Sequence, residues 1–217
     1  MLRIVSAVVL APVAIYTAYL GGWPFTVFWA AAAVAVLWEW LSLVTGPGWI
    51  IAGIGYAAVM LLAPILLRAD PAYGFFAMVL LFAIVWTTDV LGYFAGRAIG
   101  GPKLLPAVSP KKTWSGAIVG ALGAMIVAVL VVSLFDAFNR TAIAVIALLL
   151  SVLAQFGDLF ESWVKRQFGA KDASHLIPGH GGVMDRLDGF WAAALVGCVI
   201  GLLRGGFDGA ARGLLVW

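Results

Sequence analysis

The chain has 217 residues, of which 64% are hydrophobic and only 11% are charged, and its mean hydropathy is +1.09. Soluble domains are nearer half apolar, so this composition excludes an ordinary soluble protein and indicates a polytopic membrane protein. The single cysteine, Cys198, excludes a disulfide framework and a thiolate metal site, and a net charge of +3 without a basic tail points away from a nucleic-acid partner.

Seven apolar segments approach the length of about 20 residues that a membrane-spanning helix needs. They lie at 4–20, 24–44, 49–67, 73–95, 115–135, 141–161 and 189–204. The first looks like a signal peptide, but no small-residue cleavage site precedes Gly21, so we interpret it as a retained span. The sequence therefore predicts an all-α polytopic integral membrane protein with about seven transmembrane helices. We divide it into N-terminal helices over 1–72 and a C-terminal region over 73–217 that carries the motifs, ending in an interfacial helix over 205–217.

The lysines and arginines are unevenly shared between the two sides that alternating spans would create. One side receives Arg3, Arg97, Lys103, Lys111, Lys112, Lys165, Arg166, Lys171 and Arg186. The other receives Arg68, Arg140, Arg204 and Arg212. This bias of nine against four predicts a cytoplasmic N-terminus, cytoplasmic long loops and an external C-terminus.

Two carboxylates lie within apolar segments, where an ionisable side chain is a candidate functional residue. Glu39 is near the cytoplasmic end of the second segment, and we favour a structural role in which it reaches the headgroups or pairs with Arg3. Asp89 shares a helix face with Gly92 and Gly96, whose spacing favours close helix packing. An unpaired Asp89 beside such a contact would be costly, so we expect it to be paired or functional.

A basic loop ends directly before the fifth apolar segment. Its last residues are Ser109, Pro110, Lys111, Lys112, Thr113 and Trp114. Two lysines and two hydroxyl groups beside a helix N-terminus suit phosphate binding. Anchoring of the topology by positive charge explains the lysines equally well. The chain has no G-x-x-x-x-G-K-[ST] pattern, which excludes a P-loop nucleotide site.

Charge is densest between Ser151 and Asp188, a segment that holds five of the ten acidic residues, four of the thirteen basic residues and both histidines. In its first half, helical spacing places four polar residues on one face: Asp158, Glu161, Ser162 and Lys165. A polar face on membrane-like sequence favours contact with a protein interior or a watery cavity. A solvated helix end at the membrane surface would show the same pattern.

The second half of this segment begins as a loop, because the sequence PGHGG at 178–182 interrupts a helix. A helix then restarts, and its first turns carry Asp185, Arg186 and Asp188. Carboxylates at a helix start are favoured by the helix dipole. Together with Asp158 they would equally form an oxygen-rich site for a hard cation such as Mg2+. The spacing leaves both interpretations open.

Taken together, these stretches resemble the phosphatidate cytidylyltransferase (CDP-diacylglycerol synthase) family. The match to the family signature includes Ser162, Lys165-Arg166, Lys171-Asp172, Ser174, Ile177-Pro178, His180-Gly181-Gly182-Val183 and Asp185-Arg186-Leu187-Asp188. Asp89 with residues 92–97, residues 109–114 and residues 157–162 are similar to the family as well. Val90 and Ser115 depart from its pattern, and the chain is shorter than typical bacterial members.

The resemblance implies transfer of CMP from CTP to phosphatidate, giving CDP-diacylglycerol and pyrophosphate, with Mg2+ as cofactor and the number of metal ions open. The implied metal ligands are Asp158 and Asp185, then Asp188 and Asp89. The implied catalytic set is Asp158, Asp185, Lys165, Arg166 and Lys171. The implied substrate-binding set is Ser109, Lys111, Lys112, Thr113, Ser162, His180, Gly181, Gly182 and Arg186.

The expected partners are CTP, phosphatidic acid and the lipid bilayer, with no nucleic acid and a homodimer left open. The expected location is the inner (plasma) membrane, with the active site on the cytoplasmic side. A transporter or channel with an acidic intramembrane site is the alternative from another class, and the placement of charge on loops rather than at the bilayer midplane argues against it. Another CTP-using lipid transferase or a polyprenol kinase is a nearer alternative, which the reaction products would distinguish.

Overall fold

The computed structural model describes residues 2–135, 138–174, 176 and 181–217, and the side chains of residues 2–8 are not described. Within these ranges the chain forms eight helices and one two-stranded sheet. In order they are α1 (Leu2–Leu20), α2 (Gly22–Leu43), α3 (Pro47–Ala69), α4 (Gly74–Ala98), β1 (Lys103–Leu105), β2 (Ser109–Thr113), α5 (Trp114–Val132), α6 (Arg140–Gln167), α7 (Met184–Gly205) and α8 (Ala210–Leu215).

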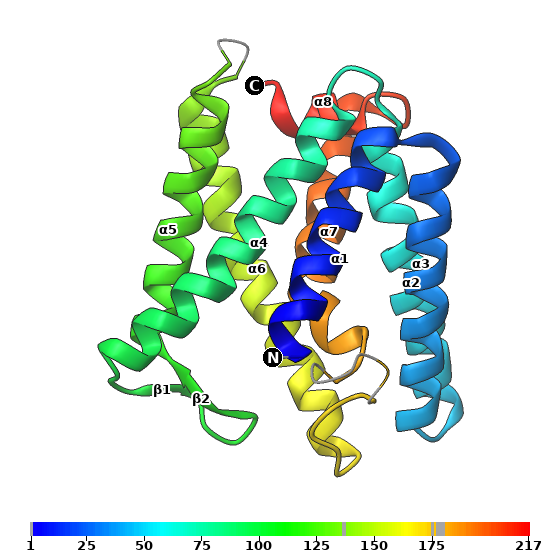
Figure 1. Ribbon diagram of the computed structural model, residues 1–217, viewed down its shortest axis with the longest axis vertical. Helices are drawn as coiled ribbons and strands as arrows, with labels where there is room; N and C mark the ends of the chain where they lie inside the picture. Colours follow the sequence, from blue (N-terminus) through cyan, green and yellow to red (C-terminus); the bar gives the residue numbers. More distant parts are fainter. Residues whose placement is uncertain (1, 136–137, 175, 177–180) are drawn as a thin grey trace.

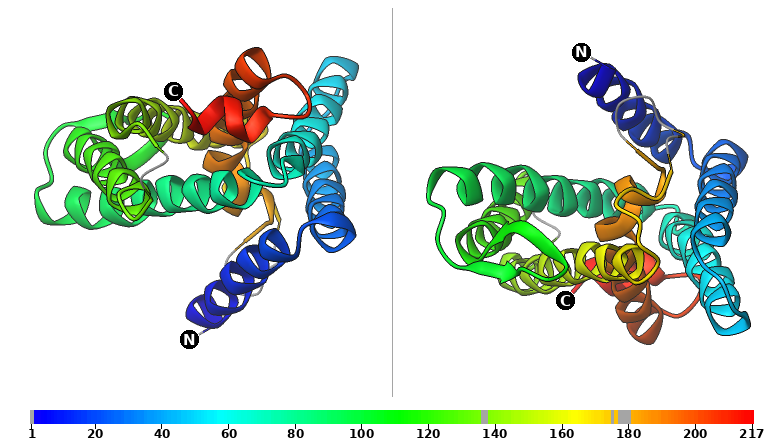
Figure 2. Two further views of the ribbon diagram at one scale, coloured as in Figure 1. Left: turned by 90° about the horizontal axis from the view of Figure 1, so that it is seen from above. Right: turned by 90° about the horizontal axis from the view of Figure 1, so that it is seen from below.

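The long helices run alternately up and down a single bundle (Figure 1). The start of α1, the β1–β2 hairpin, the end of α6 and the start of α7 lie at the lower end, and α8 lies at the upper end. The motifs that are far apart in the sequence therefore gather at one end of the bundle. The views along the bundle show α4, α5 and α6 on one side and α2 and α3 on the other, with α7 between them (Figure 2).

Six helices, α2 to α7, are long and apolar enough to cross a membrane. They confirm the all-α polytopic fold and coincide with six of the seven predicted segments. The seventh span stays a prediction, because the described apolar part of α1 covers only Val9–Leu20. The sixth predicted span, which ends at about residue 161, lies within a longer helix, in agreement with the helical spacing that extends to Lys165. Helix α6 continues to Gln167 and has 28 residues, about 42 Å at 1.5 Å per residue, so it exceeds the ~30 Å hydrocarbon thickness.

Helices α4 and α5 pack through glycines, as the spacing of Gly92 and Gly96 predicts. A Cβ atom built on Gly116 would lie 2.5 Å from the carbonyl oxygen of Gly92. One built on Gly120 would lie 2.7 Å from the carbonyl oxygen of Thr88. Such distances leave no room for a side chain, so the two backbones touch. In lipid, where hydrophobic burial gives little drive to helix association, this close contact supplies packing energy.

Stacked aromatic rings connect the N-terminal helices to the later ones. The rings of Tyr56 on α3 and Trp191 on α7 are 4.4 Å apart and almost parallel. Trp40 on α2 stacks on Tyr56 at 5.2 Å, and Phe160 on α6 lies 6.3 Å from Trp191. These contacts place α2 and α3 against the part of the bundle that carries the motifs. The division at residue 72 stays a prediction.

The segment between α4 and α5, expected to be a loop, contains an antiparallel hairpin. Lys103 pairs with Thr113, and Leu105 pairs with Ser109. The adjoining helix ends stabilise it, because the Ser115 hydroxyl donates to the Gly100 carbonyl at 2.5 Å. Sequence periodicity gives no signal for strands this short. The all-α prediction therefore holds for the bundle, with this small sheet added at one end.

Candidate active site

The crossing of α6 and α7 places two of the predicted metal ligands beside each other. A Cβ atom on Gly157 would lie 2.5 Å from the carbonyl oxygen of Asp188, and one on Gly189 would lie 3.1 Å from the carbonyl oxygen of Ala154. The two helices thus touch at residues adjacent to Asp158 and Asp188. The charges of these two carboxylates interact with each other, and that of Asp89 on α4 interacts with both.

Lys112 on strand β2 contacts Asp158 on α6. Its Nζ donates to Oδ2 of Asp158, and the Ser162 hydroxyl is 3.4 Å from Oδ1 of the same carboxylate. The side chains of Lys112 and Asp158 are 29% and 27% exposed. This ion pair joins two predicted motifs that are 46 residues apart in the sequence. It therefore brings the basic hairpin against the acidic face of α6.

The other hairpin residues of the predicted phosphate site are placed differently. Lys111 is exposed, and Ser109 is half-buried. Thr113 is buried and serves as the N-cap of α5, where its hydroxyl accepts a hydrogen bond from the Gly116 amide at 3.2 Å. A hydroxyl group in this position stabilises the helix start. In this arrangement Thr113 fixes the start of α5, whereas Lys111 faces outward and Lys112 turns to Asp158.

Lys165 forms a buried ion triad with Glu161 and Asp185. Its Nζ lies 2.8 Å from Oε1 of Glu161 and 2.5 Å from Oδ1 of Asp185. The side chains of the lysine, glutamate and aspartate are 9%, 0% and 8% exposed. This triad joins the last turns of α6 to the first turn of α7. Lys165, predicted to hold phosphate, is occupied by two carboxylates, and Glu161 is a member of the site that the predicted set omits.

Asp185 also organises the loop that precedes α7. Its Oδ2 accepts hydrogen bonds from the amides of Gly182 at 2.7 Å and Ala173 at 2.9 Å. Gly181 has a φ of +84°, and a Cβ atom there would lie 2.8 Å from the same carboxylate. Glycine suits this position because it adopts positive φ without strain. Both carboxylate oxygens of Asp185, a predicted metal ligand, are thus engaged by protein donors.

The remaining predicted residues are solvent-facing or fall outside the description. Lys171 is exposed, and exposed Arg166 donates to the Ala170 carbonyl at 2.8 Å. Arg186 is exposed on the first turn of α7, and its charge interacts with that of Asp89. His180 lies outside the described residues.

Glu39 on α2 belongs to the site, although the predicted set omits it. It is 0% exposed, and it accepts hydrogen bonds from the hydroxyl of Ser174 at 2.6 Å and from the amides of Val183 at 2.8 Å and Met184 at 2.7 Å. The predicted contact with headgroups is wrong because the carboxylate is fully buried, and the alternative pairing with Arg3 depends on a side chain that lies outside the description. The sequence signal that points to it is a lone carboxylate in an apolar segment.

The predicted Mg2+ site can be compared with these donors. Among the described residues, no three histidine, cysteine or acidic side chains gather closely enough to hold a metal ion by themselves. Magnesium is commonly held by one or two carboxylates together with water and substrate phosphates. Partly exposed Asp158, whose charge interacts with that of Asp188, suits that requirement, whereas Asp185 would first have to release its donors. Magnesium binding stays a prediction.

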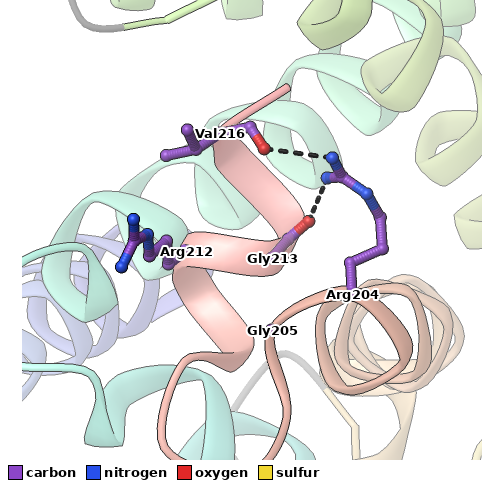
Figure 3. A pocket seen from close by; sticks show the side chains of 5 residues that line it. All are labelled: Arg204, Gly205, Arg212, Gly213 and Val216. Atoms are coloured by element: carbon purple, nitrogen blue, oxygen red, sulfur yellow. Dashed lines mark hydrogen bonds between the residues drawn. The ribbon is translucent and has the colours of Figure 1, made fainter.

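A surface pocket lies at the opposite end of the bundle, lined by Arg204, Gly205, Arg212, Gly213 and Val216 (Figure 3). Arg204 donates to the carbonyl oxygens of Gly213 and Val216 and stacks on the ring of Trp217 at 3.4 Å. Arg212 extends from the other side of α8. Because Arg204 fastens α8 to α7 here, and the acidic residues of the predicted site, Asp89, Asp158, Asp185 and Asp188, lie at the far end, we place the candidate active site at the motif end.

Comparison with known proteins identifies the family of the chain. Residues 45–203 match the model of the cytidylyltransferase family. The chain belongs to this family. It is 43% identical to the phosphatidate cytidylyltransferase of Brucella abortus (strain 2308) over 88% of this chain and 89% of the relative. It is 38% identical to that of Rickettsia bellii over 86% of this chain and 84% of the relative. The cytidylyltransferase motifs from Asp89 to Asp188 lie inside the matched range, and Glu39 lies outside it.

Proposed function

We propose that this chain transfers CMP from CTP to phosphatidate, giving CDP-diacylglycerol and pyrophosphate in phospholipid biosynthesis. The family membership and the names of the relatives support this reaction. The structural observation that carries it is the contact of Lys112 with Asp158, because it brings a phosphate-binding type of residue to the acidic face of α6. A site at one end of a membrane bundle also suits a reaction between a lipid and a water-soluble nucleotide.

The reaction needs charge neutralisation and orientation more than a general base. The phosphate monoester of phosphatidate has a second pKa of about 6 and is mostly ionised at neutral pH. One of its oxygens attacks the α-phosphorus of CTP, the bond from that phosphorus to the β-phosphate oxygen breaks, and pyrophosphate leaves with the electron pair. The obstacle is the negative charge on both reactants, so the protein must supply cations in fixed positions.

Lys112 is the residue best placed to exchange its partner for a phosphate. It and Asp158 are each more than a quarter exposed, and ion pairs at such positions contribute only about 0–1 kcal/mol. Separating them therefore costs little, after which the lysine is available to an anion. Exposed Lys111, Lys171, Arg166 and Arg186 provide further positive charge at the same end. Buried Lys165 instead holds Asp185 in place.

Asp158 and Asp188 are the residues that we propose to hold Mg2+, with Asp89 close by. When bound, Mg2+ neutralises phosphate charge and aligns the reacting groups for in-line displacement. Release of Asp158 from Lys112 would free both partners at once, one to accept a cation and the other to bind an anion. The same rearrangement would leave the buried triad of Lys165 intact.

We further propose that the protein lies in the inner membrane with this end toward the cytosol. The excess of lysine and arginine on the predicted cytoplasmic side supports the orientation. The cytosol is also where CTP is available. A homodimer stays a prediction.

The direct test is an assay of purified protein with CTP, phosphatidate and Mg2+, in which lipid-bound cytidine and pyrophosphate are measured. We expect both products in equal amounts. Phosphorylated lipid and CDP would instead identify a lipid kinase, and no lipid product across several Mg2+ concentrations and phosphatidate species would contradict the proposed reaction.

A further inference from the structure

Glu39 reaches the motif region from a distant part of the chain. It lies on α2, outside the range that matches the family, yet its carboxylate binds the amides of Val183 and Met184, more than 140 residues later. It also accepts a hydrogen bond from the hydroxyl of Ser174 in the preceding loop. One fully buried carboxylate thus binds both Ser174 and the start of α7.

The contacts of this carboxylate lead on to the charged residues in the first turns of α7. Met184 is the first residue of α7, and the next residue is Asp185, which binds the amide of Gly182 and the amine of Lys165. A Cβ atom on Gly182 would lie 2.7 Å from both carboxylate oxygens of Glu39, so Glu39 fills the space against this loop. Because Arg186 and Asp188 follow on the same helical turns, a shift of the α7 start would move them relative to Asp158.

We propose that Glu39 is a positioning residue of the cytidylyltransferase site. Through this residue, the N-terminal helix α2 holds the start of α7 in place. Its negative charge also suits the start of α7, where amide donors and the helix dipole favour an anion. The residue touches no reacting atom. It acts by fixing where α7 begins, and hence where Asp185, Arg186 and Asp188 stand. This inference uses the proposed reaction for its kinetic test.

The discriminating variant is Glu39→Gln, which keeps the shape but removes the charge and directs an NH2 group toward amide donors. Hydrogen bonds to a charged group are worth more than neutral ones, and their loss typically corresponds to about a 10- to 100-fold effect. We expect kcat/KM for CTP to fall by about that factor, with KM for CTP raised as well as kcat lowered. Ser42→Ala on the same helix is the matched control, because Ser42 is exposed and its hydroxyl donates to the Trp38 carbonyl of its own helix.

A merely structural role would reduce the number of folded molecules, and that lowers the maximal rate while leaving KM for CTP unchanged. Ser174→Ala provides a milder change that removes one donor and keeps the charge of Glu39. We expect a smaller increase in KM for CTP from this variant, and less than additive effects when it is combined with Glu39→Gln, because both act on one network. An unchanged KM in both single variants, or strictly additive effects, would overturn the proposal.

Hydrogen exchange separates this proposal from the proposed reaction, because it needs no turnover. In the full chain in detergent, Glu39→Gln should speed exchange of the amides in residues 181–188, and Ser42→Ala should not. If the unmodified protein makes no CDP-diacylglycerol but this segment is still deprotected, the reaction is wrong and the positioning role stands. If the segment exchanges at the unmodified rate in Glu39→Gln, the positioning role is wrong whatever the activity.

Discussion

Replacing Lys165 with methionine is expected to destabilise the protein strongly, because the lysine amine is the shared partner of two buried carboxylates. Lys165→Met would leave Glu161, which is 0% exposed, and Asp185, which is 8% exposed, without their common cation. Breaking a buried ion pair by removing one partner costs about 3–5 kcal/mol. Because all three side chains are buried, solvent screening reduces this energetic cost only slightly.

In a protein of this size, 1 kcal/mol changes the melting temperature by about 2–4 °C, so we expect a decrease of about 6–20 °C. The double variant Glu161→Gln/Lys165→Met removes a carboxylate together with the amine. Asp185 keeps the amide donors of Ala173 and Gly182. Replacing a buried pair by uncharged groups of similar volume is often nearly neutral, and we expect the double variant to recover at least half of the lost stability.

The assay is thermal unfolding of the purified variants in one detergent, followed by the loss of monodisperse protein. Arg166→Met is the matched control, because Arg166 is the exposed neighbour and its loss should change stability by less than about 0.5 kcal/mol. If Lys165→Met has the same melting temperature as Arg166→Met, or if the double variant is no more stable than Lys165→Met, the buried triad does not stabilise the fold. Lys165 would then be an open phosphate-binding residue, as its sequence motif suggests.

Three further outcomes are expected. Asp158→Asn should lower Mg2+-dependent formation of CDP-diacylglycerol by about 100-fold or more, whereas Asp208→Asn at the opposite end should not; equal rates would contradict the ligand role. Gly157→Ala should destabilise by about 1–3 kcal/mol through overpacking, whereas Gly55→Ala meets open space; equal melting temperatures would disprove the tight crossing. A cysteine at Lys103, with the native cysteine replaced, should react only from the cytoplasm; labelling from outside would reverse the topology.

The parts of the fold that could be predicted from the sequence are those that local pattern determines. Six spans follow from runs of apolar residues, and the glycine contact of α4 follows from the spacing of Gly92 and Gly96. The charged end of α6 follows from the sequence as well, because the helical spacing continues from Asp158 to Lys165, past the end of the apolar segment. Charged residues lower the mean hydropathy of a segment, so an apolar segment ends before its helix does. The helix continues through charged residues wherever they find partners, as Lys165 and Glu161 do.

The choice of partners could not be predicted, because it depends on how helices far apart in sequence turn toward one another. Lys112 and Lys165 both belong to recognisable motifs, but nothing in the spacing assigns the first to Asp158 and the second to Asp185. Glu39 shows the same limit more clearly. Its isolation in an apolar segment points to it, whereas its amide partners, Val183 and Met184, stand at the start of α7, which four helices separate from α2 in the sequence.

The hairpin between α4 and α5 affects the free energy with which the site binds an anion. An isolated two-stranded sheet is at best marginally stable in water. Here its ends are fixed by the backbone contact of the two helices and by the bonds from Ser115 to Gly100 and from Trp114 to Pro102. Folding of the membrane helices therefore closes this loop, and the conformational entropy of the hairpin is already lost before an anion binds. Lys112 meets its ligand on a strand that is already ordered, so more of the attraction between lysine and phosphate remains available as affinity.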